Sequence, residues 1–146
     1  MEIRPYQNKD ETDVVRLWRL VFPDNPPWND PLSDIHRKLT MQRELFLVAV
    51  LENKVVGTIM AGFDGHRGWI HLLAVLPEFR KLNIGRDLML RVERDIKAYG
   101  CTKVNLQVRA TNKGVIEFYR KLGYLVEDHV SMGKLFSSTP NDNSSR

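Results

Sequence analysis

The sequence has a single cysteine and no apolar stretch long enough to cross a membrane. Cys101 cannot form an internal disulfide, which fits a protein of a reducing compartment. No apolar run approaches the roughly 20 residues that span a bilayer, and residues 1–5 lack the apolar core of a signal peptide. We therefore expect a cytoplasmic protein without a membrane partner.

Two common nucleotide-binding motifs are also missing. The sequence contains neither Gly-Lys-Ser/Thr nor Gly-x-Gly-x-x-Gly, so a P-loop and a dinucleotide-binding fold are not supported. The net charge is only +4 and the basic residues are spread along the chain, which argues against nucleic acid as a partner. They are densest at Arg80–Arg86 and at Arg120-Lys121, an arrangement that suits a compact polyanion.

The composition that remains is ordinary for a globular domain. The chain has 146 residues, of which 42% are hydrophobic and 27% charged, and this length fits one domain with a proper core. The last ten residues contain no apolar side chain. We therefore predict a single domain over residues 1–136 and a disordered tail over residues 137–146. A monomer and a homodimer both stay open, and no metal cofactor is expected.

One stretch, residues 69–99, organises the rest of the chain. Residues 69–75 (WIHLLAV) are apolar and β-rich apart from His71, and Pro77 closes the predicted strand. Residues 86–99 show apolar spacing typical of a helix that ends at Gly100. A strand that leads into a helix leaves free backbone N–H groups at the helix start, where the helix dipole adds positive potential. With Arg80, Lys81 and Arg86 nearby, this turn predicts a phosphate or pyrophosphate site.

The remaining pattern predicts alternating groups of strands and helices. The first predicted elements are a strand at 2–6, a helix capped by Asn8 with Glu11, and a helix with Asp30 as N-cap that runs toward Met41. Strands at 45–51 and 55–63, joined by a tight turn, then lead to the strand and helix of 69–99. A strand at 103–108, a helix from Thr111 or Asn112 to Leu122, and closing strands at 124–126 and 130–135 complete the prediction. The order βααβββαβαββ indicates an α+β (mixed α/β) domain.

Two motifs resemble one enzyme family. Arg-x-x-Asn-x-Gly at 80–85 resembles the acyl-CoA pyrophosphate loop of the GNAT (Gcn5-related) N-acetyltransferases, with Asn83 in place of the first glycine. Asparagine is the non-glycine residue that best tolerates a positive φ, so this departure is chemically mild. Asn112 together with Phe118–Tyr124 resembles a second block of that family. Residues 28–31 and 64–68 resemble its YpeA-type branch, whose members are uncharacterised.

The resemblance implies a fold and a reaction. The element order is similar to the GNAT acyl-CoA N-acyltransferase fold, in which the middle strands of a central mixed sheet splay apart. The implied activity is acetyl transfer from acetyl-CoA to a primary amine by direct attack in a ternary complex. The resemblance places Tyr119 as general acid at the leaving sulfur and Asn112 near the pantetheine arm. The residues expected to bind acetyl-CoA are Leu73, Ala74, Val75, Arg80, Lys81, Leu82, Asn83, Ile84, Gly85, Arg86 and Asn112.

The general base and the acceptor stay open in the sequence. An alkyl amine has a pKa of about 10 and must lose a proton before attack. His71, Asp64, Glu78 and a water chain are all candidates, and strand alternation puts His71 on the face of Trp69, Leu73 and Val75. The acceptor is either a small-molecule amine or a protein or peptide amine.

Three further alternatives also stay open. The charged turn at 64–68 either helps to choose the acceptor or is only a solvated turn. Trp28 either caps the core or lines a substrate cleft, and Tyr119 has a plain core interpretation. A catalytically silent CoA-binding regulatory module is the alternative to an enzyme.

Overall fold

A computed structural model describes residues 1–136, and the predicted disordered tail at 137–146 lies outside the described residues. The chain divides into two compact units, residues 1–110 and the part from Thr111 onward. Within the described part, no helix has the length and apolar character needed to cross a bilayer. The single domain over residues 1–136 stays a prediction.

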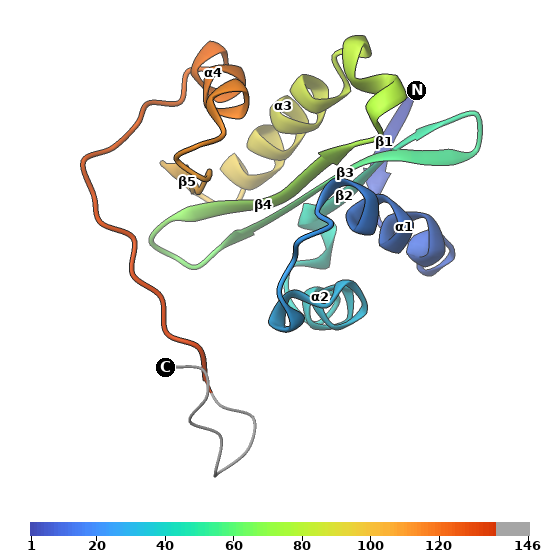
Figure 1. Ribbon diagram of the computed structural model, residues 1–146, viewed down its shortest axis with the longest axis horizontal. Helices are drawn as coiled ribbons and strands as arrows, with labels where there is room; N and C mark the ends of the chain where they lie inside the picture. The colour runs from blue at the N-terminus through green and yellow to red at the C-terminus, as the bar shows by residue number, and fades with distance from the viewer. Residues whose placement is uncertain (137–146) are drawn as a thin grey trace. The chain divides into compact units, whose positions relative to one another are not determined.

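The first unit is built on a five-stranded mixed sheet (Figure 1). Its strands are β1 (Glu2–Pro5), β2 (Phe46–Leu51), β3 (Lys54–Phe63), β4 (Gly68–Val75) and β5 (Val104–Leu106), and they lie in chain order. Neighbouring strands are antiparallel except for β4 and β5, which are parallel. The tight turn between β2 and β3 has Glu52 and Asn53 at φ of 51° and 61°, which matches the right-handed twist of a hairpin.

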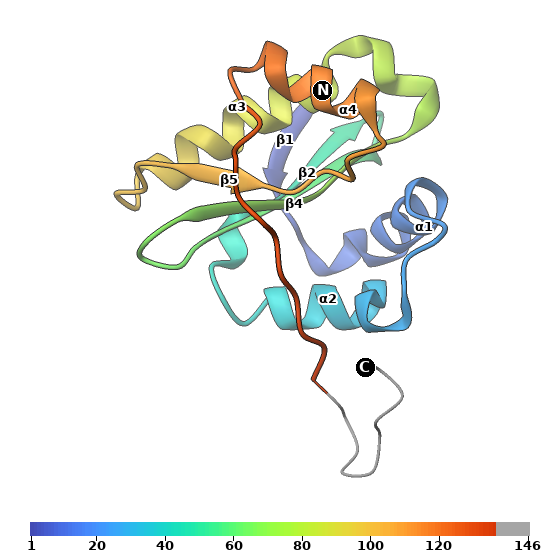
Figure 2. The ribbon, with the colours of Figure 1, turned by 60° about the vertical axis from the view of Figure 1, so that its left-hand side comes forward.

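Helices cover both faces of this sheet (Figures 1 and 2). The helix α3 (Ile84–Lys97) lies on one face, and α1 (Glu11–Val21) and α2 (Pro31–Lys38) lie on the other. Gly57 lets α3 approach closely, because a Cβ there would lie 3.1 Å from side-chain atoms of Ile84 and Leu88. The fully buried side chains come from both layers and include Leu17, Trp18, Ile35, Phe46, Leu47, Ile59, Leu88, Met89 and Ile96.

The N-terminal caps of the two helices compare differently with the prediction. Asp30 caps α2 as predicted, since its carboxylate accepts the backbone N–H of Ser33 at 3.0 Å and Pro31 takes the first helical position. The predicted cap at Asn8 is wrong. A 3-10 turn at Asn8–Asp10 precedes α1, Gln7 caps that turn in a capping box with Asp10, and Asp10 is in turn the N-cap residue of α1.

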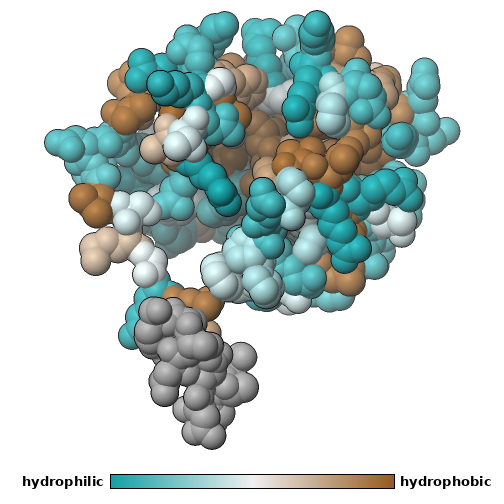
Figure 3. Space-filling view, viewed as in Figure 1, coloured by the Kyte–Doolittle hydropathy of each residue, from teal (hydrophilic) through white to brown (hydrophobic). Residues whose placement is uncertain are grey.

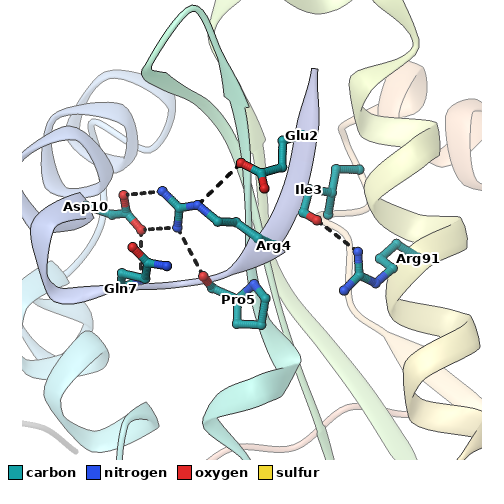
Figure 4. Close-up of polar contacts among 7 residues, drawn as sticks. All are labelled: Glu2, Ile3, Arg4, Pro5, Gln7, Asp10 and Arg91. Atoms are coloured by element: carbon teal, nitrogen blue, oxygen red, sulfur yellow. Dashed lines mark hydrogen bonds and ion pairs between the residues drawn. The ribbon is translucent and has the colours of Figure 1, made fainter.

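A charged cluster holds the turn before α1 in place (Figure 4). Arg4 on β1 donates two hydrogen bonds to Asp10, at 2.8 and 3.0 Å, and the backbone N–H of Gln7 donates to the same carboxylate at 2.8 Å. On the other face, Arg91 of α3 donates to the carbonyl of Ile3 at 2.9 Å. The short first strand is therefore held by both helical layers.

Side chains from the last residue of α2 and from the segment after it cover one edge of β3. The last pair between β2 and β3 is Phe46 with Met60, so the edge beyond it has no strand alongside from β2. Lys38, which is buried, donates to the carbonyl of Ala61 there. The side-chain amide of Gln42 donates to the carbonyl of Phe63 at 2.9 Å and accepts its N–H at 2.8 Å.

The second unit contains α4 (Lys113–Lys121). Of the two predicted caps, Thr111 and Asn112, Asn112 is the one observed, since its Oδ1 accepts the N–H of Val115 at 3.3 Å. The predicted closing strands at 124–126 and 130–135 are wrong, since the described residues after α4 form no strand. Their large apolar side chains are exposed: Leu125, Val126, Val130, Met132 and Phe136. Alternating apolar residues favour a strand only where a neighbouring strand is there to pair with them.

Polar side chains cover most of the face seen in Figure 3, with apolar patches between them. The exposed large apolar side chains of the first unit include Leu20, Trp28, Met41, Leu82 and Leu90. Single exposed apolar residues of this kind are normal for a folded domain. Short 3-10 helices at Pro27–Asn29, Arg43–Leu45 and Pro77–Leu82 complete the described structure.

Candidate active site

The predicted phosphate site is a 3-10 turn that leads into α3. Pro77–Leu82 follows β4, and Asn83 then takes the left-handed conformation (φ 59°, ψ 21°) directly before the first residue of α3. The positive φ inferred for Asn83 is therefore present. The N–H of Asp87 donates to the carbonyl of Asn83 at 3.0 Å and closes the first turn. The N–H groups of Ile84, Gly85 and Arg86 precede that bond, as an anion at a helix N-terminus requires.

The side chains around this turn differ in their roles. Arg80, Lys81, Leu82, Asn83 and Arg86 are exposed. Ile84 is only 1% exposed and packs in the core, so only its backbone is free to meet a ligand. Fixed positive charge and backbone donors therefore surround one point, which fits the pyrophosphate of a coenzyme A molecule.

The strand β4 leaves its neighbour β5 after three residues. The parallel pairing runs from Gly68–Val104 to Ile70–Leu106, and β4 then continues for five residues without a β5 partner. On its other side it stays paired with β3, where Thr58 faces Ala74 and Gly57 faces Val75. In the part of the sheet that the structure describes, no strand pairs with the β5 side of Leu73, Ala74 and Val75, so this edge is open to a ligand. It leads directly into the phosphate turn.

A bulge interrupts β4 just before this open segment. Thr58 pairs with Ala74 but Met60 pairs with His71, so β4 carries one extra residue between them. Leu72 sits in the bulge with a φ of 54°, a conformation that leucine rarely adopts. Its carbonyl accepts a hydrogen bond from the hydroxyl of Thr58 at 3.0 Å. The sequence contains no sign of this bulge, because no glycine or asparagine marks it.

The bulge corrects the predicted orientation of His71. Directly paired residues of an antiparallel ladder point to the same side, so His71 shares a face with Trp69, Met60 and Ala74. The sequence predicted that His71 lies on the same face as Leu73 and Val75. This is wrong for Val75, which pairs with Gly57 on the α3 face. Leu73 lies in the bulge itself.

His71 has the charge state of a usable base. His71 is exposed at the surface of β4, but the surrounding protein still partly desolvates its ring and so lowers its pKa. The positive charge of Lys38 lowers the pKa further, and Asp34 acts in the opposite direction. Lys38 and Asp34 both belong to α2, so the imidazole faces that helix. Its neutral form dominates at pH 7, and a neutral imidazole accepts a proton.

The other two candidate bases are placed differently. Asp64 accepts the backbone N–H groups of His66 and Arg67, each at 2.7 Å, and these bonds hold its pKa below the usual range. It therefore closes the turn that leads into β4, with Gly65 at a φ of 94°. Glu78 is exposed at the start of the phosphate turn.

Tyr119 lies in the second unit, on α4. It is 9% exposed, and burial raises its pKa to about 12, so its hydroxyl keeps its proton at neutral pH. The rings of Phe118 and Tyr124 meet it edge-on, with centroids 5.1 and 5.8 Å away. Proton donation and plain packing are both compatible with this setting.

Comparison with known proteins decides the family. The family model described as "Acetyltransferase (GNAT) family" matches residues 12–124, more than half of the chain. The chain belongs to the GNAT acetyltransferase family. The predicted family, the α+β GNAT fold and the class of enzyme, an N-acetyltransferase, are thereby confirmed.

Relatives of this GNAT chain support the assignment over nearly its whole length. It is 44% identical to the acetyltransferase YE1169 of Yersinia enterocolitica over 134 residues, which cover 92% of this chain and 94% of the relative. Among solved structures, Ard1 from Thermoplasma volcanium superposes with a TM-score of 0.75 at 28% identity, covering 86% and 83% of the two chains. The PaiA N-acetyltransferase from Thermoplasma acidophilum, solved in complex with coenzyme A, shares the fold with a TM-score of 0.69 at 24% identity, over 88% and 92%.

Sequence reasoning missed two features of this GNAT chain. A surface cavity of about 530 Å³ lies at the loop between α1 and α2. It is lined by four prolines and by Trp18, Arg19, Phe22, Asn25, Asn29 and Asp30. Trp28 is 56% exposed and is not among the lining residues. The second feature is a hydrogen bond from Trp18 to Thr58 at 2.8 Å, between residues 40 positions apart.

Within residues 1–136, no group of three His, Cys, Asp or Glu side chains is arranged to hold a metal ion.

Proposed function

We propose that this chain transfers the acetyl group of acetyl-CoA to a primary amine, by direct attack of the amine on the thioester within a ternary complex. One observation carries the proposal. β4 parts from β5 after Ile70, turns through a bulge, and runs by way of Leu73, Ala74 and Val75 into a turn with free helix-start N–H groups and basic side chains.

That arrangement suits the two ends of coenzyme A. An extended pantetheine arm with its amides pairs like an added strand with an open edge, and the part of the open edge used here is Leu73–Val75, where the strand approaches the phosphate turn. The pyrophosphate then reaches the N–H groups of Ile84, Gly85 and Arg86, with Arg80 and Lys81 beside it. Asn112 uses its side-chain oxygen to cap α4, so its amide nitrogen is the group left for the cofactor.

Two groups divide the proton transfers in this proposal. His71 takes the proton of the attacking amine, supported by its neutral state and by its place directly before the bulge. Asp64 is a poorer base, because two backbone N–H groups already stabilise its charged form. Tyr119 returns a proton to the leaving thiolate, supported by a raised pKa that keeps its hydroxyl protonated.

The acceptor amine approaches from the face of the sheet that carries α1 and α2. Thr58, Met60 and His71 share this face, and Trp18 joins it to the cavity at the α1–α2 loop. A lining with prolines, aromatic rings and few charges suits an amine on an extended, partly apolar body, such as a peptide. Arg67, whose guanidinium bonds only to its neighbour's carbonyl among the hydrogen bonds described, is the remaining candidate for contact with an acceptor carboxylate.

The decisive experiment measures thiol release from acetyl-CoA in the presence of polyamines, amino acids and peptides. We expect release that depends on one class of amine and that falls strongly in the Gly85→Glu variant at subsaturating acetyl-CoA. If coenzyme A binds in calorimetry but no amine gives thiol release, the chain is the silent CoA-binding module instead. If coenzyme A does not bind at all, the phosphate site itself is wrong.

A further inference from the structure

A buried relay of hydrogen bonds connects α1 to the bulge of β4. The indole N–H of Trp18 donates to the hydroxyl oxygen of Thr58 at 2.8 Å, and that hydroxyl donates to the carbonyl of Leu72 at 3.0 Å. Thr58 is 0% exposed and Trp18 is 1% exposed. Water therefore cannot replace either bond without entering the core.

The relay acts on the most unusual backbone position of the strand. Leu72 is the one non-glycine residue with a positive φ inside a described β-strand, and such a conformation persists only where its surroundings enforce it. A hydroxyl has a single proton to donate. Because the indole N–H already occupies an acceptor site of Thr58, that proton is directed toward the Leu72 carbonyl.

The bulge sets the geometry of everything after it on β4. The extra residue turns the strand so that Ala74 shares a face with His71 and Val75 faces α3. It also sets the direction of the backbone of Leu73 and Ala74, where the proposed function puts the thioester end of the cofactor. A small rotation at Leu72 would therefore move the β4 backbone donors and acceptors that meet the reacting group.

We propose that Trp18 and Thr58 are positioning residues for acetyl transfer, and that their relay fixes the Leu72 carbonyl and so aims the β4 backbone at the thioester. This inference rests on the proposed function. Trp18 also lines the cavity at the α1–α2 loop. The same side chain therefore borders the acceptor side and orients the cofactor side of the reaction.

The test uses variants that change the relay atom by atom. Thr58→Val keeps the shape but removes the hydroxyl, and we expect kcat to fall about tenfold to a hundredfold, the range for a small misplacement of reacting groups. Thr58→Ser restores the hydroxyl, and kcat should return to within about threefold of the wild type. The dissociation constant for coenzyme A should change by less than about threefold in both, because the phosphate turn is built separately.

A matched control comes from Thr40. Its hydroxyl also donates to a backbone carbonyl, that of Arg37 at 2.6 Å, but at the exposed end of α2. Thr40→Val should leave kcat unchanged. Trp18→Phe gives a second route to the relay, and its kcat should lie between those of the wild type and Thr58→Val because Thr58 can still bond to Leu72.

Hydrogen exchange at the amides of Leu73 and Ala74 gives a readout that does not need turnover. Thr58→Val should speed exchange there at least tenfold relative to the amides of β2, while Thr58→Ser and Thr40→Val should not. Failure of wild-type turnover would count against the proposed function alone, since the exchange result would still decide the relay. The relay is overturned if a folded Thr58→Val variant keeps wild-type kcat, or if exchange at Leu73 and Ala74 does not change.

Discussion

Arg80 and Val75 are joined by a hydrogen bond, in which the Nε–H of the arginine donates to the strand carbonyl over 3.2 Å. Val75 is the last residue of β4, where we propose that the pantetheine arm pairs, and Arg80 belongs to the phosphate turn. One contact therefore ties the two halves of the proposed cofactor site together. In the proposed complex, a bound pyrophosphate would compete with the Val75 carbonyl for the guanidinium.

Removal of this guanidinium should weaken coenzyme A binding modestly. We expect Arg80→Ala to lower the affinity about three- to tenfold at low ionic strength, and less in high salt, because exposed charges are screened. Arg94→Ala is the matched control, since Arg94 is an exposed arginine of α3 that pairs with Asp95. Titration calorimetry at two salt concentrations measures both. Equal affinities for Arg80→Ala and the wild type at low salt would show that the guanidinium stays on Val75.

A carboxylate at the start of α3 should have a larger effect. Gly85→Glu puts a side chain and a negative charge where the pyrophosphate approaches, so the affinity for coenzyme A should fall at least tenfold, or about 1.4 kcal/mol. Gly133→Glu adds the same charge at a position where a Cβ meets nothing within 4 Å, and it should bind normally. Normal binding by a folded Gly85→Glu protein would rule out the phosphate turn.

His71 should control the acid side of the pH profile. A base works only when unprotonated, and partial desolvation together with Lys38 lowers the pKa of this histidine, so kcat/KM should fall only below about pH 6.5. We expect His71→Gln to reduce kcat about 10²-fold and to remove this limb. Lys38→Gln should move the limb to higher pH, since it removes a positive charge beside the ring. A His71→Gln enzyme with the wild-type profile would point to Glu78 or water.

Loss of the Tyr119 hydroxyl should slow turnover without weakening binding. Tyr119→Phe keeps the ring contacts, and we expect kcat to fall roughly 10²-fold with little change in coenzyme A affinity. With a pKa raised to about 12 by burial, this tyrosine should cause no alkaline limb below about pH 11. Steady-state kinetics at several pH values tests this. Wild-type turnover in the variant would make Tyr119 a packing residue only.

The pair of Arg4 and Asp10 should dominate the electrostatic stability of the first unit. Burial alone would raise the pKa of Asp10, but the hydrogen bonds from Arg4 and from the Gln7 N–H outweigh it and lower the pKa. Asp10→Asn leaves a partly buried guanidinium without its partner and should cost about 3 kcal/mol in urea unfolding at pH 7. The difference from the wild type should shrink as the pH falls below about 4, where the wild-type carboxylate is protonated too.

A surface ion pair provides the comparison for that loss. Asp34 pairs with Arg37, whose side chain is 61% exposed, so Asp34→Asn should cost less than about 1 kcal/mol. A loss of similar size in both variants would show that the Arg4–Asp10 pair has no special weight.

Local signals predicted much of this structure. Asp30 with Pro31 marked the start of α2, Asn112 marked the start of α4, and the glycines and asparagines of tight turns marked the hairpins. Such features act between residues a few positions apart, so a single sequence displays them. The start of α1 was ambiguous because Asn8 with Glu11 and Gln7 with Asp10 have the same spacing. Gln7 with Asp10 forms the capping box of the preceding 3-10 turn, and Arg4, which comes from β1, bonds to that Asp10.

Features that depend on distant partners were not predictable. The bulge at Leu72 depends on Thr58 and Trp18, which meet only after β3, β4 and α1 have packed. The orientation of His71 follows from that bulge, so it was assigned wrongly with respect to Val75. Residues 124–135 have the alternation of strands, but pairing requires an edge at the right place, and periodicity carries no information about one.

The contacts of Gln42 have a consequence for behaviour at high concentration. A strand edge with unpaired N–H and C=O groups invites pairing with a strand from another molecule. At Phe63 the side-chain amide of Gln42 supplies one donor and one acceptor, as a peptide unit of a neighbouring strand would. Gln42 thus shields this edge at Phe63 as Lys38 does at Ala61, and a chain with alanine in place of Gln42 would be more prone to aggregate through β3.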